Sequence, residues 1–332
     1  MRLLVLNCHE PWIYQLRVLD ADLDIVVDLA GRKVSGWDHR MRPLPPRSTT
    51  LSMADALARR PDWDAVICHN ITDLVDTASI EAPKLLVLHD TLDGRMAQQG
   101  ATFERGEMIA LLRTYVERLG ANVIPVTTAK GESWGVPGRP LSCWADPADY
   151  LPPTYRVAAG LRVANHVSTK RVFLAWDFHE EAFGGLPVTL VGHNPELGVE
   201  AARDWGDLKD RLAEHRFFIH TADPRYEDGF NMAMAEAMAA GLPVISNAHP
   251  TSPLTHGVDG FLAATPAEAR AHALRLMADV TLARAMGEAA RKTAIARFSP
   301  ESFRSGLNDA LARARKKFAR RLRAEARAAR SG

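Results

Sequence analysis

The feature that most constrains the fold of this chain is an alternation of short apolar runs with longer amphipathic stretches, which occurs twice along 332 residues. In the first half, the runs rich in Leu, Val and Ile occupy residues 3–8, 24–28, 64–69, 84–89 and 122–127. Continuous apolar strands that alternate with amphipathic helices are typical of a parallel sheet with crossover helices. We therefore predict a doubly wound α/β domain in the first half.

A second series of apolar runs follows a proline-rich break at residues 144–160, and the chain has helical periodicity from residue 264 onward. The runs of this series occupy residues 161–166, 187–192, 216–220 and 243–246. Doubly wound sheets bind ligands at the carboxyl ends of their strands, so two such domains should hold a ligand between them. The predicted parts are two α/β domains and a basic C-terminal helix, at residues 1–150, 151–305 and 306–332.

Composition and charge exclude several classes of function. The formal net charge is +1, so we expect no nucleic acid partner. The three cysteines form no Cys-x-x-Cys pair, which suits a reducing compartment and argues against zinc bound by thiols. The N-terminal apolar run is shorter than that of a signal peptide, and the sequence has no run of about 18 apolar residues. We therefore expect a cytoplasmic protein.

One segment, residues 220–246, contains a strand end, an acidic turn with a glycine, a small apolar helix and a Gly-Leu-Pro exit. From Met232 to Ala240 every residue is Met or Ala except Glu236. A carboxylate among such residues costs several kcal/mol unless a donor meets it. The two hydroxyls of a ribose would supply such donors. The alternative is that Glu236 faces solvent on a half-exposed helix.

The N-terminus of this helix, near Phe230 to Met232, offers free backbone amides and the positive end of a helix dipole to an anion such as a pyrophosphate. Gly229 lets the backbone approach a ligand closely. Asp228 stands just before the helix, where it would either cap the helix or bind sugar hydroxyls.

The stretch EDGFNMAMAEAMAAGLPVIS resembles the signature of retaining glycosyltransferases of family four. The resemblance covers residues 160–300 most closely. It implies a GT-B fold: two Rossmann-like doubly wound domains facing across a cleft, an acceptor side in the first and a nucleotide-sugar site in the second, with a helical C-terminal tail. It further implies that Glu236 binds the donor ribose and that Asp228, which replaces the usual Glu, contacts the donor sugar. The amides of Gly229, Phe230, Asn231 and Met232 would approach sugar and phosphate.

A second stretch, VANHVSTKR at residues 163–171, is similar to the strand and loop that place an Arg and a Lys beside the pyrophosphate in this family. Lys170 occupies the Lys position, and Asn165 occupies the Arg position. Arg171 would then supply the missing cation. Positive charge here stabilises the departing diphosphate, although the alternative is a pair of solvated basic residues.

A looser similarity lies in KLLVLHD at residues 84–90, where the family has a His that faces the donor sugar and phosphate. The resemblance gives this role to His89, whereas a lone His is otherwise more often structural. For His69, at the end of the preceding strand, we favour the structural role. Trp12 would either stack on an acceptor sugar or belong to the core.

Taken together, these residues predict transfer of a sugar, with retention, from a nucleotide-diphosphate sugar to a glycan, lipid-linked or small-molecule acceptor in cell-envelope or surface polysaccharide synthesis. The catalytic residues in this hypothesis are His89, Lys170 and Asp228. The sequence contains no DxD motif in a loop that follows a predicted strand and no His or Cys cluster at metal-ligand spacing, so we expect neither a metal nor a cofactor. The alternatives are a nucleotide-sugar epimerase of the same architecture and an inactive sugar-nucleotide-binding homologue.

The C-terminal stretch at residues 313–330 contains nine basic residues and one acid. It could lie against anionic lipid at the inner face of the membrane as a peripheral contact. We favour a solvated helix, because Phe318 and Leu322 form only a small apolar face.

Overall fold

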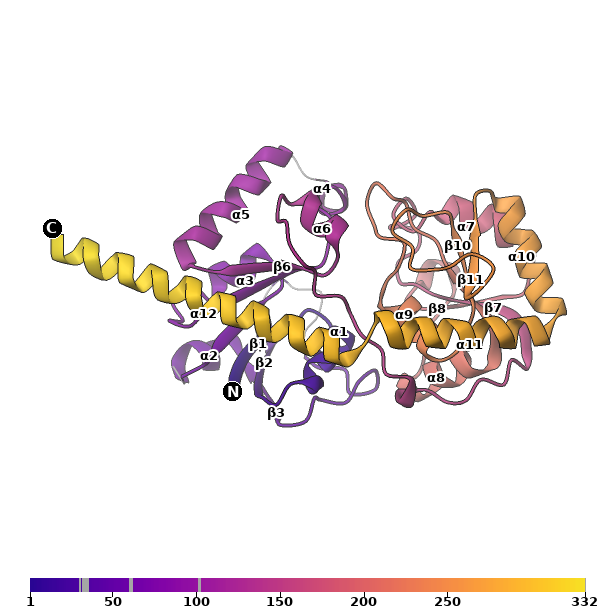
Figure 1. Cartoon of the computed structure of the whole chain (residues 1–332), viewed down its shortest axis with the longest axis horizontal. Helices are drawn as coiled ribbons and strands as arrows, with labels where there is room; N and C mark the ends of the chain where they lie inside the picture. The colour runs from indigo at the N-terminus through magenta and orange to yellow at the C-terminus, as the bar shows by residue number, and fades with distance from the viewer. Residues whose placement is uncertain (30, 32–35, 60–61, 101–102, 332) are drawn as a thin grey trace. The chain divides into compact units, whose positions relative to one another are not determined.

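The structure is a computed structural model that describes residues 1–29, 31, 36–59, 62–100 and 103–331. The chain divides into two compact units (Figure 1). The first unit contains Met1–Ser142 together with Glu301–Gly332, and the second contains Cys143–Pro300. The sequence placed the first boundary at residue 150 and gave the C-terminal helix a separate part, whereas contacts divide the chain at residue 142 and group that helix with the first unit.

The first unit is built on a six-stranded parallel sheet in the order β3-β2-β1-β4-β5-β6. The chain reverses its direction of growth between β1 and β4, where Leu4 pairs with Asp24 of β2 on one side and Val66 of β4 on the other. This is the strand order of a dinucleotide-binding fold, in which ligands bind at the reversal point. The strands are β1 (Arg2–Leu6), β2 (Asp22–Asp28), β3 (Ser48–Ser52), β4 (Ala65–Cys68), β5 (Lys84–Leu88) and β6 (Asn122–Pro125).

Helices connect these strands, and they pack on the sheet because they carry an apolar face. Leu74 and Leu112 lie in the buried cluster that covers the side of the sheet on which Leu4 and Leu6 point. The helices are α1 (Glu10–Tyr14), α2 (Met53–Arg59), α3 (Ile71–Asp76), α4 (Leu92–Gln99), α5 (Arg105–Leu119) and α6 (Thr128–Ser133), with a 3-10 turn η1 (Gln15–Val18) after α1.

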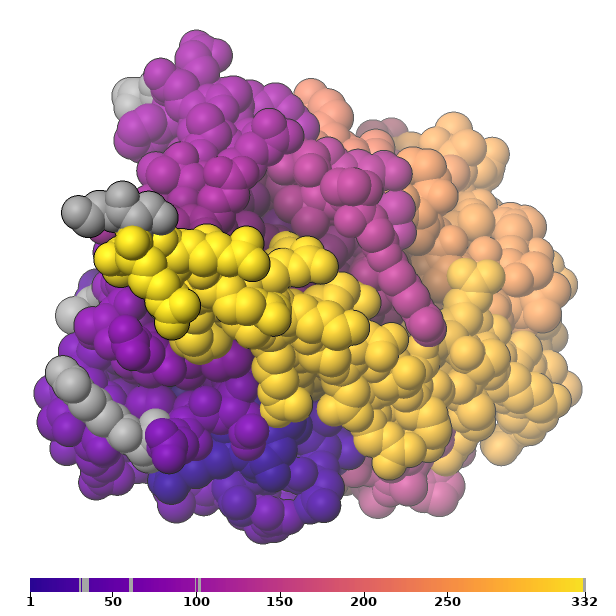
Figure 2. All heavy atoms as spheres, turned by 60° about the vertical axis from the view of Figure 1, so that its left-hand side comes forward, coloured from indigo at the N-terminus to yellow at the C-terminus, as the bar shows by residue number. Residues whose placement is uncertain are grey.

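The last helix, α12 (Pro300–Ser331), lies against the first unit (Figure 2). Its buried face includes Phe303 and Leu307, and the Ala310 carbonyl accepts a hydrogen bond from the Asn122 side chain at 3.3 Å. Arg315 also pairs with Asp64 at 3.5 Å. The helix therefore starts six residues before the predicted 306 because its first turns are part of the core of this unit.

The second unit contains a five-stranded parallel sheet in the order β11-β10-β9-β7-β8, with its reversal point between β7 and β9. The strands are β7 (Val157–Val163), β8 (Val188–Val191), β9 (His215–His220), β10 (Val244–Asn247) and β11 (Gly260–Ala263). The helices are α7 (Trp176–Phe183), α8 (Trp205–Glu214), α9 (Met232–Ala239), α10 (Pro266–Ala278) and α11 (Val280–Arg297), and the 3-10 turns are η2 (Pro147–Asp149) and η3 (Pro195–Leu197).

This sheet separates two buried clusters. Phe218 and Leu161 point to the side covered by α8, α9 and α11, and Phe217 and Ile219 point to the side covered by α7 and α10. The alternation follows from the two-residue period of a strand. The predicted α/β class, with two doubly wound parallel sheets and a helical C-terminal tail, is confirmed.

None of the helices that the structure describes is long and apolar enough to cross a membrane.

Candidate active site

The predicted site residues lie at the carboxyl ends of strands, beside the reversal point of each sheet. In the second unit, Lys170 follows β7, and Asp228 and Glu236 follow β9. In the first unit, His69 follows β4 and His89 follows β5. This is where doubly wound sheets bind ligands, so each unit presents one set of candidate residues.

The close packing of helix α9 explains why its sequence is almost entirely Met and Ala. Met234, Ala235, Ala237, Met238 and Ala239 are buried in the cluster that also contains α11. The helix stops at Gly241, whose φ of +90° suits glycine, and its carbonyl accepts from the Tyr155 hydroxyl at 2.6 Å. Glu236 is the one carboxylate of α9 and is only half-buried.

The N-cap of α9 is Asn231, whose Oδ1 accepts from the Met234 amide at 2.9 Å. Asp228 therefore does not cap the helix. Its side chain is buried, with 2% of the residue exposed. The amides of Met232 and Ala233 have no protein acceptor within the described part of the chain. The first turn of α9 is thus able to donate to an anion.

The turn before α9 is held by the loop after β10. The Gly229 amide donates to Thr251 Oγ1 at 2.8 Å, and His249 Nε2 lies 3.1 Å from the Glu227 carbonyl. A Cβ at Gly229 would lie 2.7 Å from His249 Nδ1 and from the Ser252 amide. The structure thus gives the Gly229 amide a protein acceptor, and the glycine allows close packing of two loops, a role that the sequence resemblance did not imply.

The ring of His249 is neutral, since burial lowers its pKa. Its Nδ1 accepts from the Thr251 amide at 3.2 Å, which leaves the proton on Nε2 to be donated to the Glu227 carbonyl. His249 and Thr251 therefore fix the position of the turn that carries Asp228.

The loop that carries Lys170 is fixed by two asparagines. Asn194 is fully buried, its Oδ1 accepts from the Val167 amide at 2.8 Å, and its Nδ2 donates to the Ala164 carbonyl at 2.8 Å. Asn165 Oδ1 accepts from the His193 amide at 2.8 Å. Asn165, which the sequence resemblance aligned with an Arg, thus joins two loops.

The two neighbouring cations differ in their surroundings. Arg171 forms ion pairs with Asp177, at 2.5 Å, and with Glu180. Lys170 is half-buried, and no carboxylate among the described residues pairs with its ammonium. Lys170 is therefore the cation with an uncompensated charge at this strand end.

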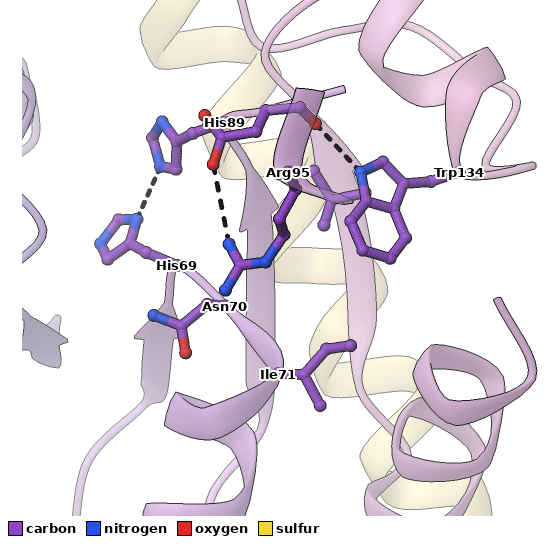
Figure 3. A pocket seen from close by; sticks show the side chains of 8 residues that line it. His69, Asn70, Ile71, His89, Arg95 and Trp134 are labelled. Carbon is purple, nitrogen blue, oxygen red and sulfur yellow. Dashed lines mark hydrogen bonds and ion pairs between the residues drawn. The ribbon is translucent and has the colours of Figure 1, made fainter. Parts of the chain in front are cut away.

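In the first unit, the rings of His69 and His89 face each other (Figure 3). His69 Nδ1 and His89 Nε2 are 2.8 Å apart and share a hydrogen bond. The ring of Trp12 packs edge-on against both histidines, with centroid distances of 4.7 and 5.2 Å. Since Trp12 is 2% exposed, it belongs to the core and supports the pair.

A small pocket lies beside this pair, lined among others by Asn70, Arg95 and Trp134 (Figure 3). Arg95 pairs with Asp90 at 3.6 Å, and the Trp134 indole donates to the Asp90 carbonyl at 3.0 Å. One side of the pocket is thus held by contacts to Asp90.

Burial keeps both histidines neutral. It lowers the pKa of His69 to about 3 and the pKa of His89 well below its usual value. It also raises the pKa of the nearby Cys8 thiol. The pair is therefore made of two uncharged rings at neutral pH.

Cys8, His69 and His89 bring their potential metal-ligand atoms within 4.8 Å of one another. The sequence did not reveal this group because its members follow three different strands. Two nitrogens bound to one tetrahedral zinc ion at about 2.05 Å would lie about 3.3 Å apart. The facing nitrogens of His69 and His89 are closer, at 2.8 Å, which is the distance of a hydrogen bond. The arrangement therefore fits a hydrogen bond between the two rings better than a zinc ion bound by both. The sequence favoured a structural role for His69 and did not predict its contact with His89.

Residues 188–279 match the model of a family described as Glycosyl transferases group 1. No curated protein matches the chain in sequence. The structure is similar to HepE of Anabaena in complex with UDP and glucose, with a TM-score of 0.68, 15% identity, and coverage of 94% of this chain and 99% of HepE. The chain has the GT-B fold.

Two further GT-B structures support this conclusion. A variant of S. aureus TarM in complex with fondaparinux, alpha-GlcNAc-glycerol and UDP has a TM-score of 0.56 and 18% identity, over 74% of this chain and 55% of TarM. The sucrose-phosphate synthase from Thermosynechococcus elongatus has a TM-score of 0.56 and 14% identity, over 93% and 97% of the two chains. Within the GT-B fold, the family model matches the part of the second unit that includes Asp228 and Glu236.

Proposed function

We propose that this chain is a glycosyltransferase that transfers a sugar, with retention, from a nucleotide-diphosphate sugar. The observation that carries the proposal is the packing of α9, which buries the Met and Ala residues from 234 to 239 and leaves the Glu236 carboxylate half-buried at the carboxyl end of the sheet. A carboxylate in such a place is suited to accept from both hydroxyls of a ribose.

The diphosphate has two sources of positive potential in this unit. The amides of Met232 and Ala233 stand at the N-terminus of α9, and Lys170 follows the strand on the other side of the reversal point. Both would stabilise the charge that builds up on the leaving diphosphate. In this hypothesis Asp228 contacts the donor sugar, and His89 contributes from the first unit.

Uridine nucleotides are the first donors to test, because the HepE and TarM structures contain UDP. The acceptor in our proposal is a glycan, a lipid-linked sugar or a small molecule of cell-envelope or surface polysaccharide synthesis. TarM, which was solved with fondaparinux and alpha-GlcNAc-glycerol, makes a glycan-like acceptor the first choice.

The proposal places the chain in the cytoplasm with α12 as a solvated helix, and the alternative is a peripheral contact of α12 with anionic lipid. The basic residues of α12 from Arg313 to Arg330 are mostly exposed. Phe318 is half-buried under the Arg321 guanidinium, whereas Leu322 is 40% exposed. With so small an apolar face, the contact would be electrostatic, without insertion of the helix.

The proposal is tested by Glu236→Gln, with Glu288→Gln on the exposed face of α11 as the matched control. We expect Glu236→Gln to weaken UDP binding about 10- to 100-fold, since hydrogen bonds to a charged group contribute about 1.5–3 kcal/mol. The control should bind as the natural chain does. Calorimetric titration measures both, and equal binding by the two variants would refute a ribose contact at Glu236.

Product analysis distinguishes the reaction from its rivals. Transfer with retention gives a glycoside whose anomeric configuration matches the donor, which NMR of the product detects. An epimerised nucleotide sugar formed without acceptor would show an epimerase. Nucleotide binding without turnover on any acceptor would show an inactive homologue.

A further inference from the structure

The hydrogen bond between His69 and His89 contains one proton that belongs to one of two nitrogens. The distance of 2.8 Å from His69 Nδ1 to His89 Nε2 requires one ring to donate and the other to accept. If His69 donates, the proton of neutral His89 sits on Nδ1. If His89 donates, its Nδ1 is a bare lone pair.

The second nitrogen of His69 decides between these arrangements. His69 Nε2 is buried and has no hydrogen-bond partner among the residues that the structure describes. An N–H at this position would be an orphaned buried donor, which is rarer in proteins than an unpaired acceptor. The neutral ring therefore carries its proton on Nδ1 and leaves a lone pair on Nε2.

The neighbouring indole supports the same assignment. The ring of Trp12 packs edge-on against His69, and its Nε1–H is also buried without an acceptor in the described structure. Indole nitrogen only donates, so a second N–H in this small apolar space would add another unmet donor. A lone pair on His69 Nε2 adds none.

The backbone around His69 fixes its ring in this position. The His69 amide donates to Asp73 Oδ2 at 2.7 Å, and Asn70 Oδ1 caps α3 by accepting from the Asp73 amide at 2.9 Å.

The other titratable groups that act on His89 are His9 and Lys130, and both disfavour a positive charge on its ring. His89 is therefore a neutral ring held by one defined partner.

We infer that His69 is a positioning residue that holds His89 as a hydrogen-bond donor, with the proton on Nδ1 directed away from the pair. His89 is half-buried and lines the pocket in Figure 3, and its Nδ1 makes no hydrogen bond within the described residues. The Nδ1–H is suited to an oxygen acceptor. Resting on the proposed function, that acceptor is a hydroxyl of the donor sugar or an oxygen of its diphosphate.

The assignment excludes one role for His89. A general base needs an accessible lone pair, and the lone pair of His89 lies on Nε2, where it accepts from His69. His89 thus contributes by donating a hydrogen bond in the transition state, while His69 sets which nitrogen donates.

The tautomers are tested in the full chain without any substrate. Two-bond proton–nitrogen correlation spectra of the ¹⁵N-histidine-labelled protein distinguish Nδ1–H from Nε2–H rings. We expect Nδ1–H for both His69 and His89. A His69 ring protonated on Nε2 would overturn the inference, whatever the protein does with nucleotide sugars.

Two substitutions separate positioning from a purely structural role. In His69→Asn the amide nitrogen replaces Nδ1–H, so we expect His89 to keep its tautomer and kcat to stay within about twofold of the natural chain. In His69→Leu the donor is lost, so His89 should populate the Nε2–H tautomer and kcat should fall about tenfold, with KM for the donor nearly unchanged. His39→Asn, at an exposed site in the same unit, is the control.

The outcomes have separate meanings. If His69→Leu and His69→Asn lower kcat equally while the tautomer of His89 stays the same in both, His69 is only structural and the inference fails. If the spectra show the expected tautomers but no sugar transfer occurs with any acceptor, the proposed function fails and the hydrogen-bond assignment stands.

Discussion

At the scale of single residues, two adjacent cations show how surroundings decide function. The carboxylates of Asp177 and Glu180 already compensate the Arg171 charge, whereas no described carboxylate does so for Lys170. An ion pair at the surface lowers the field that a cation projects, and a half-buried, unpaired ammonium keeps it. In our proposal, the side-chain charge available to a diphosphate at this strand end therefore comes from Lys170.

We expect Lys170→Met to lower kcat by about 100- to 1,000-fold, the usual effect of removing one group that stabilises charge in the transition state. Arg171→Met should change kcat by less than about threefold, since its guanidinium is already paired. Steady-state kinetics with the same donor measure both variants. If Arg171→Met lowers kcat as much as Lys170→Met does, Arg171 supplies the missing cation, as the sequence resemblance implied. The ion pairs of Arg171 would then have to open when the donor binds.

At the scale of elements, the loop after β7 depends on the loop after β8. Asn194 satisfies one amide and one carbonyl of the first loop, and Asn165 returns one hydrogen bond to the second. Gly192 permits this approach, because a Cβ there would lie 2.0 Å from the Ala164 carbonyl oxygen and its φ is +146°. The two loops thus form one rigid support for Lys170.

We expect Asn194→Ala to destabilise the second unit by about 2–4 kcal/mol, since it leaves two backbone groups without their partner in a buried site. Asn165→Ala removes one hydrogen bond from an exposed side chain and should cost about 1 kcal/mol or less. Urea unfolding followed by far-UV circular dichroism measures both. An equal loss of unfolding free energy in the two variants would mean that water replaces the buried amide of Asn194.

The exposed basic part of α12 makes a second prediction at this scale. A solvated α12 would leave the chain in the supernatant of vesicles that contain anionic lipid. A peripheral contact would make the chain sediment with these vesicles at low salt and be released as ionic strength rises, because each Lys or Arg near such a surface contributes about 1 kcal/mol that salt screens. Replacing Arg320, Arg323, Arg327 and Arg330 by Gln should abolish sedimentation. Binding that resists high salt would instead require insertion of an apolar face.

At the scale of the whole molecule, the sequence predicted the architecture because apolar periodicity reports burial on both faces of a parallel sheet. It missed β3 and β11, which lie at the edges of their sheets, where β3 buries only Leu51 and β11 is four residues long. The loop contacts of Gly229 and the pairing of His69 with His89 were also missed. Such contacts join residues that are distant in sequence, so no local sequence pattern predicts them.

The chemistry of the whole molecule gives a last prediction. In our proposal the positive charge that meets the leaving diphosphate comes from Lys170 and from the amides of α9, which the chain supplies without a metal ion. Exhaustive treatment with EDTA should therefore leave kcat within about twofold of its starting value, whereas removal of a metal that bridges phosphates would cost several kcal/mol in the transition state. Added manganese should give no gain, because the amides and the ammonium already occupy the positions a cation would take. Activity that EDTA abolishes and manganese restores would mean that these groups bind the donor but do not stabilise its departure.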